Sequence, residues 1–191
     1  QVALLLYTSG TTGNPKGVML SHMNLYSNAI NSARSQELSQ GEVTLLGLPL
    51  NHSFGITTWL AALSLGMQVV LMRRFDPVEA LKALEQYKVE SAAMVPTMLA
   101  FLLDAAAGGN FDTSSLKKII VGGAPLSRRL RARFEQAFPE VQILEAYGLT
   151  EASPGVTVPP PGARQRPGSV GKTIENQEIC IMGSEDQCLP P

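Results

Sequence analysis

The sequence predicts an α/β fold: a doubly wound, mostly parallel sheet with helices on both faces, followed by a short antiparallel β segment. Three observations support this prediction. Short apolar runs of strand length recur at residues 43–48, 68–72, 91–95, 118–121 and 141–145. Helical patterns lie between these runs, as the crossovers of parallel strands require. Proline and glycine become frequent after Tyr147, where the alternation stops.

The composition narrows the function classes. The chain has 191 residues, of which 45% are hydrophobic, and a formal net charge of −1, which gives no argument for nucleic acid or an anionic membrane as partner. It contains no apolar run of the roughly 18 residues that a transmembrane helix needs. The start lacks the basic region of a signal peptide and an initiator methionine, so we expect a cytoplasmic protein and an N-terminus produced by truncation. Cys180 and Cys188 are expected to be free thiols, as in a cytoplasmic protein.

The first elements surround a loop rich in glycine and hydroxyl groups. Residues 2–6 are apolar and indicate a buried strand, and residues 17–20 indicate a second strand. Between them the sequence reads Thr8-Ser9-Gly10-Thr11-Thr12-Gly13-Asn14-Pro15-Lys16-Gly17. Glycines allow a backbone concavity of N–H groups, which hydroxyls and a lysine complete as an anion site. The stretch therefore predicts a polyphosphate site at Thr8, Ser9, Gly10, Thr11, Thr12, Gly13 and Lys16.

Two other interpretations of this loop are weaker. Gly10 and Lys16 have the spacing of a Walker A motif, but Pro15 and Gly17 stand where that motif needs glycine and Ser or Thr. A Walker A loop also opens a helix, whereas a strand is predicted here. A flexible Ser/Thr/Gly linker is disfavoured because the stretch joins one apolar run directly to another.

The helices have clear start and stop signals. Ser21 is predicted to cap a helix over residues 22–36. Asp76 followed by Pro77 begins another, and Pro96 begins a third that Gly108 and Gly109 stop. Ser127 caps a basic amphipathic helix that ends at Pro139. Ligands of doubly wound sheets bind beyond the carboxyl ends of the strands, so the segments that follow the strands are the candidate sites.

Three such segments carry chemically useful residues. His52 follows the strand over residues 43–48. Gly122-Gly123-Ala124 separates a strand from a helix, where a flat or anionic ligand can approach the backbone. Tyr147, Gly148, Thr150 and Glu151 follow the last strand of the sheet. Each has a structural alternative: a histidine with a structural role only, an ordinary glycine turn and a solvated surface acid.

Together with the loop of residues 8–17, these segments resemble the adenylate-forming enzymes, which include acyl- and aryl-CoA synthetases, adenylation domains of peptide synthetases and beetle luciferases. The resemblance implies that Lys16, His52, Thr150 and Glu151 are catalytic and that Thr8 and Glu151 help hold Mg²⁺. It also implies that Tyr147 stacks on adenine, that Thr150 bonds the α-phosphate, and that residues 122–124 and Gly148 line the nucleotide site. Residues 164–172 match the family too, with arginines expected in solvent.

The resemblance implies activation of a carboxylic acid by ATP, with Mg²⁺, and transfer of the acyl group to the thiol of CoA. Residues 49–60 contain no acidic residue, which disfavours an amino acid substrate. Ile56, Trp59 and Leu60 are expected either to line an acyl pocket or to pack in the core. The alternatives are transfer to a carrier-protein thiol and a nucleotide-binding module without chemistry.

The predicted organisation is an α/β nucleotide-binding subdomain over residues 1–153, part of a larger AMP-binding domain, and a connector with the start of a β subdomain over residues 154–191. The family's ribose-binding aspartate, hinge and C-terminal lysine find no counterpart in this sequence. We therefore expect the chain by itself to be inactive and to self-associate through exposed apolar surface.

Overall fold

The computed structural model describes residues 1–9, 13–163, 165–166, 168–184 and 187–189. Five parallel strands form the central sheet in the order β4-β3-β5-β6-β7. They are β3 (Val43–Leu46), β4 (Gln68–Leu71), β5 (Ser91–Met94), β6 (Lys118–Val121) and β7 (Gln142–Glu145). Each lies within two residues of its predicted run. The order reverses between β3 and β5, so the predicted doubly wound sheet is confirmed.

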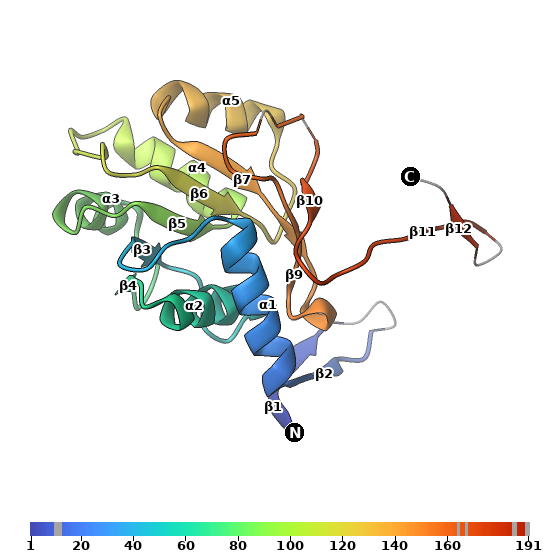
Figure 1. Cartoon of the computed structure of the whole chain (residues 1–191). Helices are drawn as coiled ribbons and strands as arrows, with labels where there is room; N and C mark the ends of the chain where they lie inside the picture. Colours follow the sequence, from blue (N-terminus) through green and yellow to red (C-terminus); the bar gives the residue numbers. More distant parts are fainter. Residues whose placement is uncertain (10–12, 164, 167, 185–186, 190–191) are drawn as a thin grey trace.

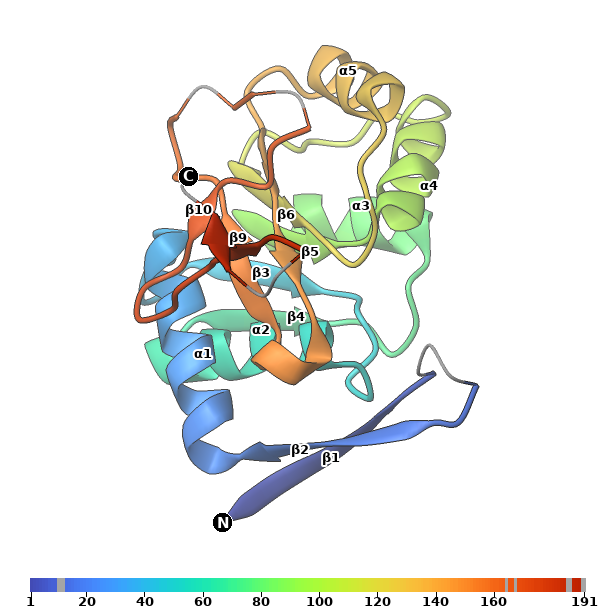
Figure 2. The same cartoon turned by 90° about the vertical axis from the view of Figure 1, so that its right-hand side faces the viewer.

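Helices cover one face of this sheet and share the other face with strands (Figures 1 and 2). The first face carries α3 (Pro77–Gln86), α4 (Pro96–Ala106) and α5 (Arg128–Ala137). The second face carries α1 (His22–Ser35) and α2 (Ser53–Leu65). Alternation along the strands divides the core: Ile119 and Val121 pack in the cluster with α3, α4 and α5, whereas Ile120 and Leu144 pack on the opposite side. All four residues of β5 are buried, as a strand covered on both faces must be.

Most helix signals act as predicted. Ser21 and Asn24 form a reciprocal capping box at the start of α1. The Asp76 carboxylate accepts hydrogen bonds from the backbone N–H groups of Val78 and Glu79 at 3.0 and 2.9 Å. Ser127 caps α5 through the N–H of Leu130. Local side-chain chemistry therefore determines where these helices begin.

The N-terminal strands differ from the prediction in one respect. β1 (Val2–Thr8) and β2 (Lys16–Ser21) pair antiparallel as a separate hairpin, with Leu5 opposite Met19. The prediction of a buried strand at residues 2–6 is wrong, because Val2, Ala3 and Leu5 are exposed. A two-stranded hairpin has two faces, and here only the face with Leu20 packs against the rest of the chain.

The described residues from Tyr147 onward include short strands and a 3₁₀ turn. β8 (Tyr147–Gly148), β9 (Gly155–Val158) and β10 (Lys172–Thr173) form an antiparallel sheet, and the 3₁₀ turn η1 (Thr150–Ala152) joins β8 to β9. Val158 and Ile174 pack on Ile120 and Leu144 of the central sheet. The sequence pattern did not identify β9, because proline residues surround it.

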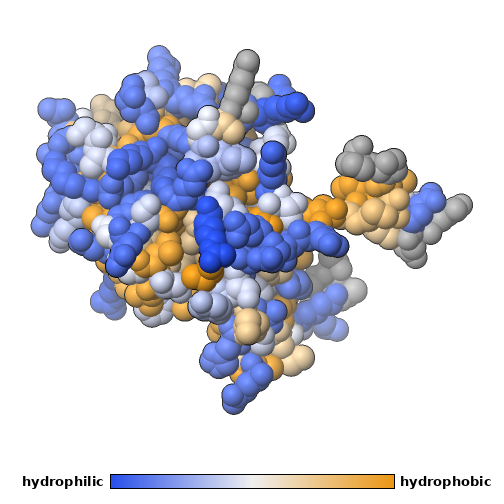
Figure 3. Space-filling view, in the orientation of Figure 1, coloured by the Kyte–Doolittle hydropathy of each residue, from blue (hydrophilic) through white to orange (hydrophobic). Residues whose placement is uncertain are grey.

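A last hairpin, β11 (Ile181–Met182) with β12 (Cys188–Leu189), stands away from the main body, and Figure 3 shows its apolar surface. The prediction of free thiols is wrong, because Cys180 and Cys188 form a disulfide across this hairpin. Their Cα atoms are 5.8 Å apart, a separation within the normal range for a disulfide. Antiparallel pairing brings the two cysteines together, and sequence spacing alone does not indicate that pairing.

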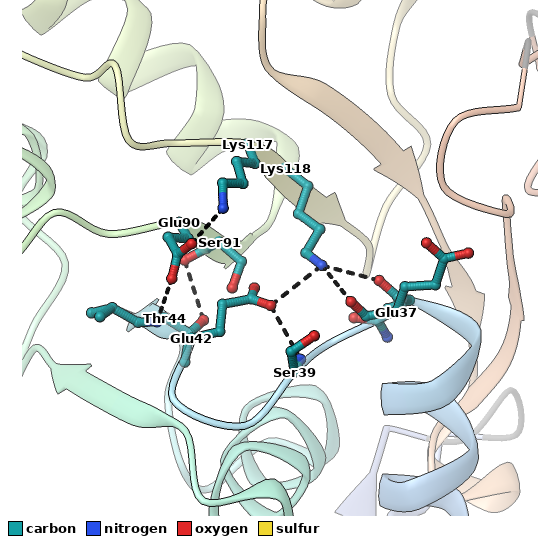
Figure 4. A network of polar contacts seen from close by, with 10 residues as sticks. Glu37, Ser39, Glu42, Thr44, Glu90, Ser91, Lys117 and Lys118 are labelled. Atoms are coloured by element: carbon teal, nitrogen blue, oxygen red, sulfur yellow. Dashed lines mark hydrogen bonds and ion pairs between the residues drawn. The ribbon is translucent and has the colours of Figure 1, made fainter.

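The amino ends of the central strands carry a network of charges (Figure 4). The Lys118 ammonium lies 3.5 Å from the Glu42 carboxylate and donates hydrogen bonds to the carbonyl oxygens of Gln36 and Glu37, just beyond α1. Glu90 accepts hydrogen bonds from Lys117 and from the backbone N–H of Val43. The lysine hydrogen bond is the main reason that the pKa of the Glu90 carboxyl is lowered. This edge of the sheet is therefore closed by ion pairs.

Candidate active site

The opposite edge of the sheet, at the carboxyl ends of the strands, holds most of the predicted site residues. A cavity of about 220 Å³ lies there between α1, α2, the end of β6 and the β8–β9 hairpin. His52, Gly122, Gly123, Tyr147, Gly148 and Thr150 all line it. They come from three separate segments that the sequence analysis singled out. The fold therefore brings six of the predicted residues to one cavity.

α2 forms one wall of the cavity, through a different face from the expected one. Phe54, Thr57, Thr58 and Ala61 line the cavity, together with Ser53 at the start of the helix. Of the two alternatives for Trp59 and Leu60, the structure favours core packing, since both pack against buried clusters. Ile56 likewise does not line the cavity. The error arose because α2 is apolar around most of its circumference, which hides the face that turns inward.

His52 is the N-cap of α2. Its Nδ1 accepts a hydrogen bond from the backbone N–H of Phe54 at 3.3 Å. In a neutral imidazole this acceptor role leaves the proton on Nε2, which is then available as a donor. The ring is exposed and also lines a neighbouring groove of about 1060 Å³, which contains Arg73 and Arg74. His52 therefore lies between the cavity and the groove. Its Nδ1 caps α2, and its Nε2 takes no part in the cap.

The glycine turn between β6 and α5 forms a second wall. Gly122 is buried, and a Cβ atom there would lie 3.4 Å from both a Phe54 ring carbon and the Ala146 carbonyl oxygen. Gly123 has a φ of +81°, a conformation that suits glycine. Ala124 is exposed and does not line the cavity. The first two residues therefore present bare backbone to the cavity.

Glu145 fixes this turn to the end of β7. Its carboxylate accepts hydrogen bonds from the backbone N–H of Leu126 at 3.0 Å and from the Arg131 guanidinium at 3.1 Å. The Glu145 side chain is only 9% exposed. Glu145 lies inside the predicted strand over residues 141–145, and no role at the site was predicted for it. A carboxylate inside an apolar strand was the available signal, because a buried charge requires partners.

Thr150 and Glu151 lie on the η1 turn. The hydroxyl oxygens of Thr150 and Ser53 are 3.3 Å apart, so the turn is bonded to the start of α2. The Glu151 carboxylate is exposed and is not among the residues that line the cavity. Tyr147, two residues before Leu149, has a half-exposed ring. Tyr147 and Glu151 are therefore accessible from solvent beside the cavity.

The described residues of the loop, 8–9 and 13–17, are not among those that line the cavity. Thr8 ends β1 and Lys16 begins β2, both with partly or fully exposed side chains. Ser9 and Gly13 are exposed, and Gly10, Thr11 and Thr12 lie outside the described residues. The strand that follows Lys16 confirms that this is not a Walker A loop, which would open a helix. β2 packs against η1, so the loop and the Thr150 turn belong to neighbouring elements.

The side chains that could hold Mg²⁺ suit an ion that takes most of its ligands from bound phosphate and water. The described residues include no group of three or more His, Cys, Asp or Glu side chains placed to bind an ion. Mg²⁺ commonly takes one or two carboxylates and completes its coordination with phosphate oxygens and water. The single carboxylate of Glu151, beside the hydroxyl of Thr150, fits that pattern.

The sequence profile of the AMP-binding enzyme family matches residues 1–191. The chain belongs to this family. The expected kinship with adenylate-forming enzymes is thereby confirmed. Within the described residues, no helix has the length and apolar character needed to cross a bilayer.

Curated relatives of this AMP-binding chain include two kinds of enzyme. It is 39% identical over 194 residues to a 4-coumarate–CoA ligase-like protein of Arabidopsis thaliana, covering 99% of the chain and 34% of that protein. It is 38% identical over 185 residues to luciferin 4-monooxygenase of Photuris pensylvanica, covering 95% of the chain and 34% of that protein. The chain thus spans about a third of the length of these relatives.

Solved structures of the family are also similar. A long-chain-fatty-acid–CoA ligase from Archaeoglobus fulgidus superimposes with a TM-score of 0.89 at 30% identity, covering 97% of the chain and 39% of that structure. An o-succinylbenzoate–CoA synthetase from Bacillus subtilis, solved with ATP and a magnesium ion, gives a TM-score of 0.85 at 31% identity, covering 98% and 38% respectively. The AMP-binding fold of the described residues is therefore that of acyl-CoA synthetases.

Proposed function

We propose that this chain is the central part of an enzyme that activates a carboxylic acid with ATP and transfers the acyl group to the thiol of CoA. The observation that carries the proposal is the convergence of His52, Thr150 and the Gly122–Gly123 backbone on one cavity. A basic or hydrogen-bonding ring, a hydroxyl and bare backbone suit a carboxylate and a phosphate that must meet. The relatives that are CoA ligases support the same reading.

Each residue has a distinct task in this proposal. Tyr147 stacks on adenine, with Gly122, Gly123 and Gly148 as the backbone around the nucleotide and Ala124 at its edge. Thr150 donates its hydroxyl to the α-phosphate, and Lys16 with the hydroxyls and amides of residues 8–13 neutralises the outer phosphates. His52 orients the acid through Nε2. Glu151, with Thr8, holds Mg²⁺, which when bound with the nucleotide neutralises phosphate charge.

The proposed chemistry has two steps. A carboxylate oxygen of the acid attacks the α-phosphorus, the bond to the β-phosphate oxygen breaks, and pyrophosphate leaves. The thiolate sulfur then attacks the acyl carbon, and AMP leaves with the bonding electrons as the thioester forms. The protein contributes positioning and fixed dipoles, which stabilise charge that builds up in each transition state.

The cavity itself favours an uncharged acyl group. Apart from His52, its lining side chains are apolar or carry neutral amides and hydroxyls, and none is Asp or Glu. An amino acid substrate would place an ammonium group there without a counter-charge, which is costly. A fatty or aryl acid is therefore the proposed substrate class.

The groove on the other side of His52 is the proposed entry for the thiol. It is lined by apolar side chains, among them Met72, Phe75 and Met98, and it contains Arg73 and Arg74. Apolar walls suit a flexible chain that ends in a thiol, and guanidinium groups suit phosphates. This pattern supports CoA as the acceptor.

The test is pyrophosphate release by the full-length protein with ATP, Mg²⁺ and a panel of fatty, aryl and amino acids. Thr150→Val, which keeps the side-chain shape, should lower kcat about tenfold to a hundredfold through loss of one hydrogen bond to a charged phosphate. Thr58→Val is the matched control, because Thr58 lines the same cavity but bonds the Phe54 carbonyl within its own helix. Acid-independent ATP use, or equal effects of the two variants, would contradict the proposal.

Two alternatives make different predictions in this assay. An enzyme that loads a carrier protein would release pyrophosphate but form no CoA thioester. A nucleotide-binding module without chemistry would bind ATP and release no pyrophosphate with any acid.

Three further expectations stay predictions: the division at residue 153, the inactivity of the isolated chain and its self-association. The cytoplasmic location does too, although its argument from free thiols is lost because Cys180 and Cys188 are paired.

A further inference from the structure

The η1 turn is attached to α1 by a single buried amide. Asn28 donates its side-chain N–H groups to the carbonyl oxygens of Ala152 and Gly155 at 3.1 and 2.8 Å. Its Oδ1 accepts the backbone N–H of Gly155 at 3.0 Å. These bonds reach both sides of the Ser153–Pro154 segment, more than 120 residues along the chain from Asn28. One side chain thus holds the start of β9, the strand that directly follows the η1 turn with Thr150 and Glu151.

The hydrogen-bonding capacity of Asn28 is fully used. Ser32 donates to the same Oδ1 at 3.4 Å, so both donors and both acceptor positions of the amide have partners. Asn28 is only 3% exposed. Asparagine is an unfavourable residue in the middle of a helix, because its side chain competes for backbone hydrogen bonds. Its position in α1 therefore has a tertiary cause, and the bonds to the turn supply one.

α2 adds a second attachment on the other side of the turn. Thr57 donates its hydroxyl to the Ser153 carbonyl oxygen at 3.0 Å, and Ser53 bonds the Thr150 hydroxyl. Gly155 packs closely on α1, since a Cβ atom at this position would lie 2.5 Å from the Ser32 hydroxyl oxygen. The turn is thus held at Thr150, Ala152, Ser153 and Gly155, while the Glu151 side chain remains exposed.

We infer that Asn28 is a positioning residue, which together with Thr57 fixes the η1 turn so that Thr150 and Glu151 face the reacting phosphate. The inference rests on the proposed function for its catalytic consequence. Loss of the Asn28 bonds lets the turn move relative to the acid, so the effect falls on kcat. The cavity that holds the acyl group is formed mainly by other residues, so KM for the acid stays within about twofold.

The experiment compares Asn28→Asp with Asn31→Asp in the full-length protein. The first change keeps Oδ1 but turns an oxygen toward two carbonyl oxygens. Asn31 is the matched control, because it lies on the same helix, is 8% exposed, and accepts its side-chain hydrogen bond from Asn176 rather than from the turn. Both variants gain the same charge in the same helix.

Two readouts are measured. Amide hydrogen exchange should accelerate about tenfold or more at Ala152, Ser153 and Gly155 in Asn28→Asp, and stay at the wild-type rate in Asn31→Asp. In acid-dependent ATP–pyrophosphate exchange, Asn28→Asp should lower kcat about tenfold to a hundredfold, with KM for the acid changed less than about twofold. Equal exchange at the turn in the two variants, or equal kcat, would overturn the inference.

Two provisions keep the test decisive. Thr57→Val, which keeps the shape and removes the donor to Ser153, should accelerate the same amides to a smaller extent, and it replaces Asn28→Asp if that variant does not fold. If the wild-type protein shows no acid-dependent exchange of pyrophosphate, the proposed function fails. In that case the hydrogen-exchange comparison still tests whether Asn28 fixes the η1 turn. Acceleration confined to the turn supports this role of Asn28, and unchanged exchange at the turn refutes it.

Discussion

The two edges of the central sheet use polar residues in opposite ways. At the amino edge, Lys118 bridges Glu42 and the end of α1, and Lys117 bonds Glu90 (Figure 4). At the carboxyl edge, His52, Tyr147 and Thr150 surround a cavity and keep polar atoms available. The same five strands carry both edges. We propose that the amino-edge charges stabilise the fold, whereas His52, Tyr147 and Thr150 at the carboxyl edge serve ligands and the Glu145–Arg131 pair there fixes the glycine turn.

The comparison predicts its largest effect for Lys118→Met. Lys118 and Glu42 are 13% and 10% exposed, so removal of the lysine leaves a buried carboxylate without its cation. We expect a loss of about 3 kcal/mol in unfolding free energy, as for other buried pairs deprived of one partner. The full-length protein should show a lower Tm and an unchanged KM for ATP.

The double variant Lys118→Met with Glu42→Gln is the control for this prediction. It removes both charges, so it should recover a large part of the lost stability. A Tm for Lys118→Met equal to that of wild type would show that the amino-edge pair has no stabilising role. A raised KM for ATP at unchanged Tm would break the contrast between the two edges.

Lys16→Ala should leave Tm unchanged and impair the use of ATP, which is the opposite of the result expected for Lys118→Met. Lys16 is exposed at the start of β2, and within the described structure no salt bridge includes it. Loss of a charge-assisted contact to phosphate should cost roughly 1.5–3 kcal/mol, or about tenfold to a hundredfold in ATP use. Steady-state kinetics and Tm of the full-length protein test this together, with Lys82→Ala on the exposed surface of α3 as the control. Unchanged kcat and KM for ATP would exclude the role.

The smallest effect is expected for Glu90 and concerns pH. The hydrogen bond from Lys117, followed by that from the Val43 N–H, lowers the pKa of Glu90 from its ordinary value of 4.5. A lowered folded-state pKa contributes stability that is present above pH 4.5 and is lost as the pH falls through the folded value. The difference in Tm between wild type and Glu90→Gln should therefore shrink below about pH 4. A constant difference from pH 7 to pH 3 would contradict the assignment.

The sequence predicts those parts of the molecule that depend on nearby residues. Asp76, Ser127 and Ser21 cap the helices that they precede, and the apolar runs become the parallel strands. The motifs at His52, Gly122 and Thr150 meet at one edge because parallel strands share a direction. The sequence therefore predicts which segments form the site.

The remaining features depend on contacts between distant residues. Asn28 gave no signal, because its partners Ala152 and Gly155 are far along the chain. The exposure of β1 follows from its pairing with β2 alone, which periodicity does not reveal. Ser53 and Thr57 are single hydroxyls in an apolar helix, and only the packed turn gives them partners. Local pattern carries no information about such pairings.

The bonds of Glu145 have a consequence for the width of the proposed adenine site. This carboxylate ties the Leu126 N–H to the end of β7, two residues before Tyr147. The glycine turn is thereby tied to the strand end that leads into Tyr147, and we expect this bond to set the distance between the two sides of the proposed site. Redesign of the proposed site toward a wider base would begin by releasing Glu145.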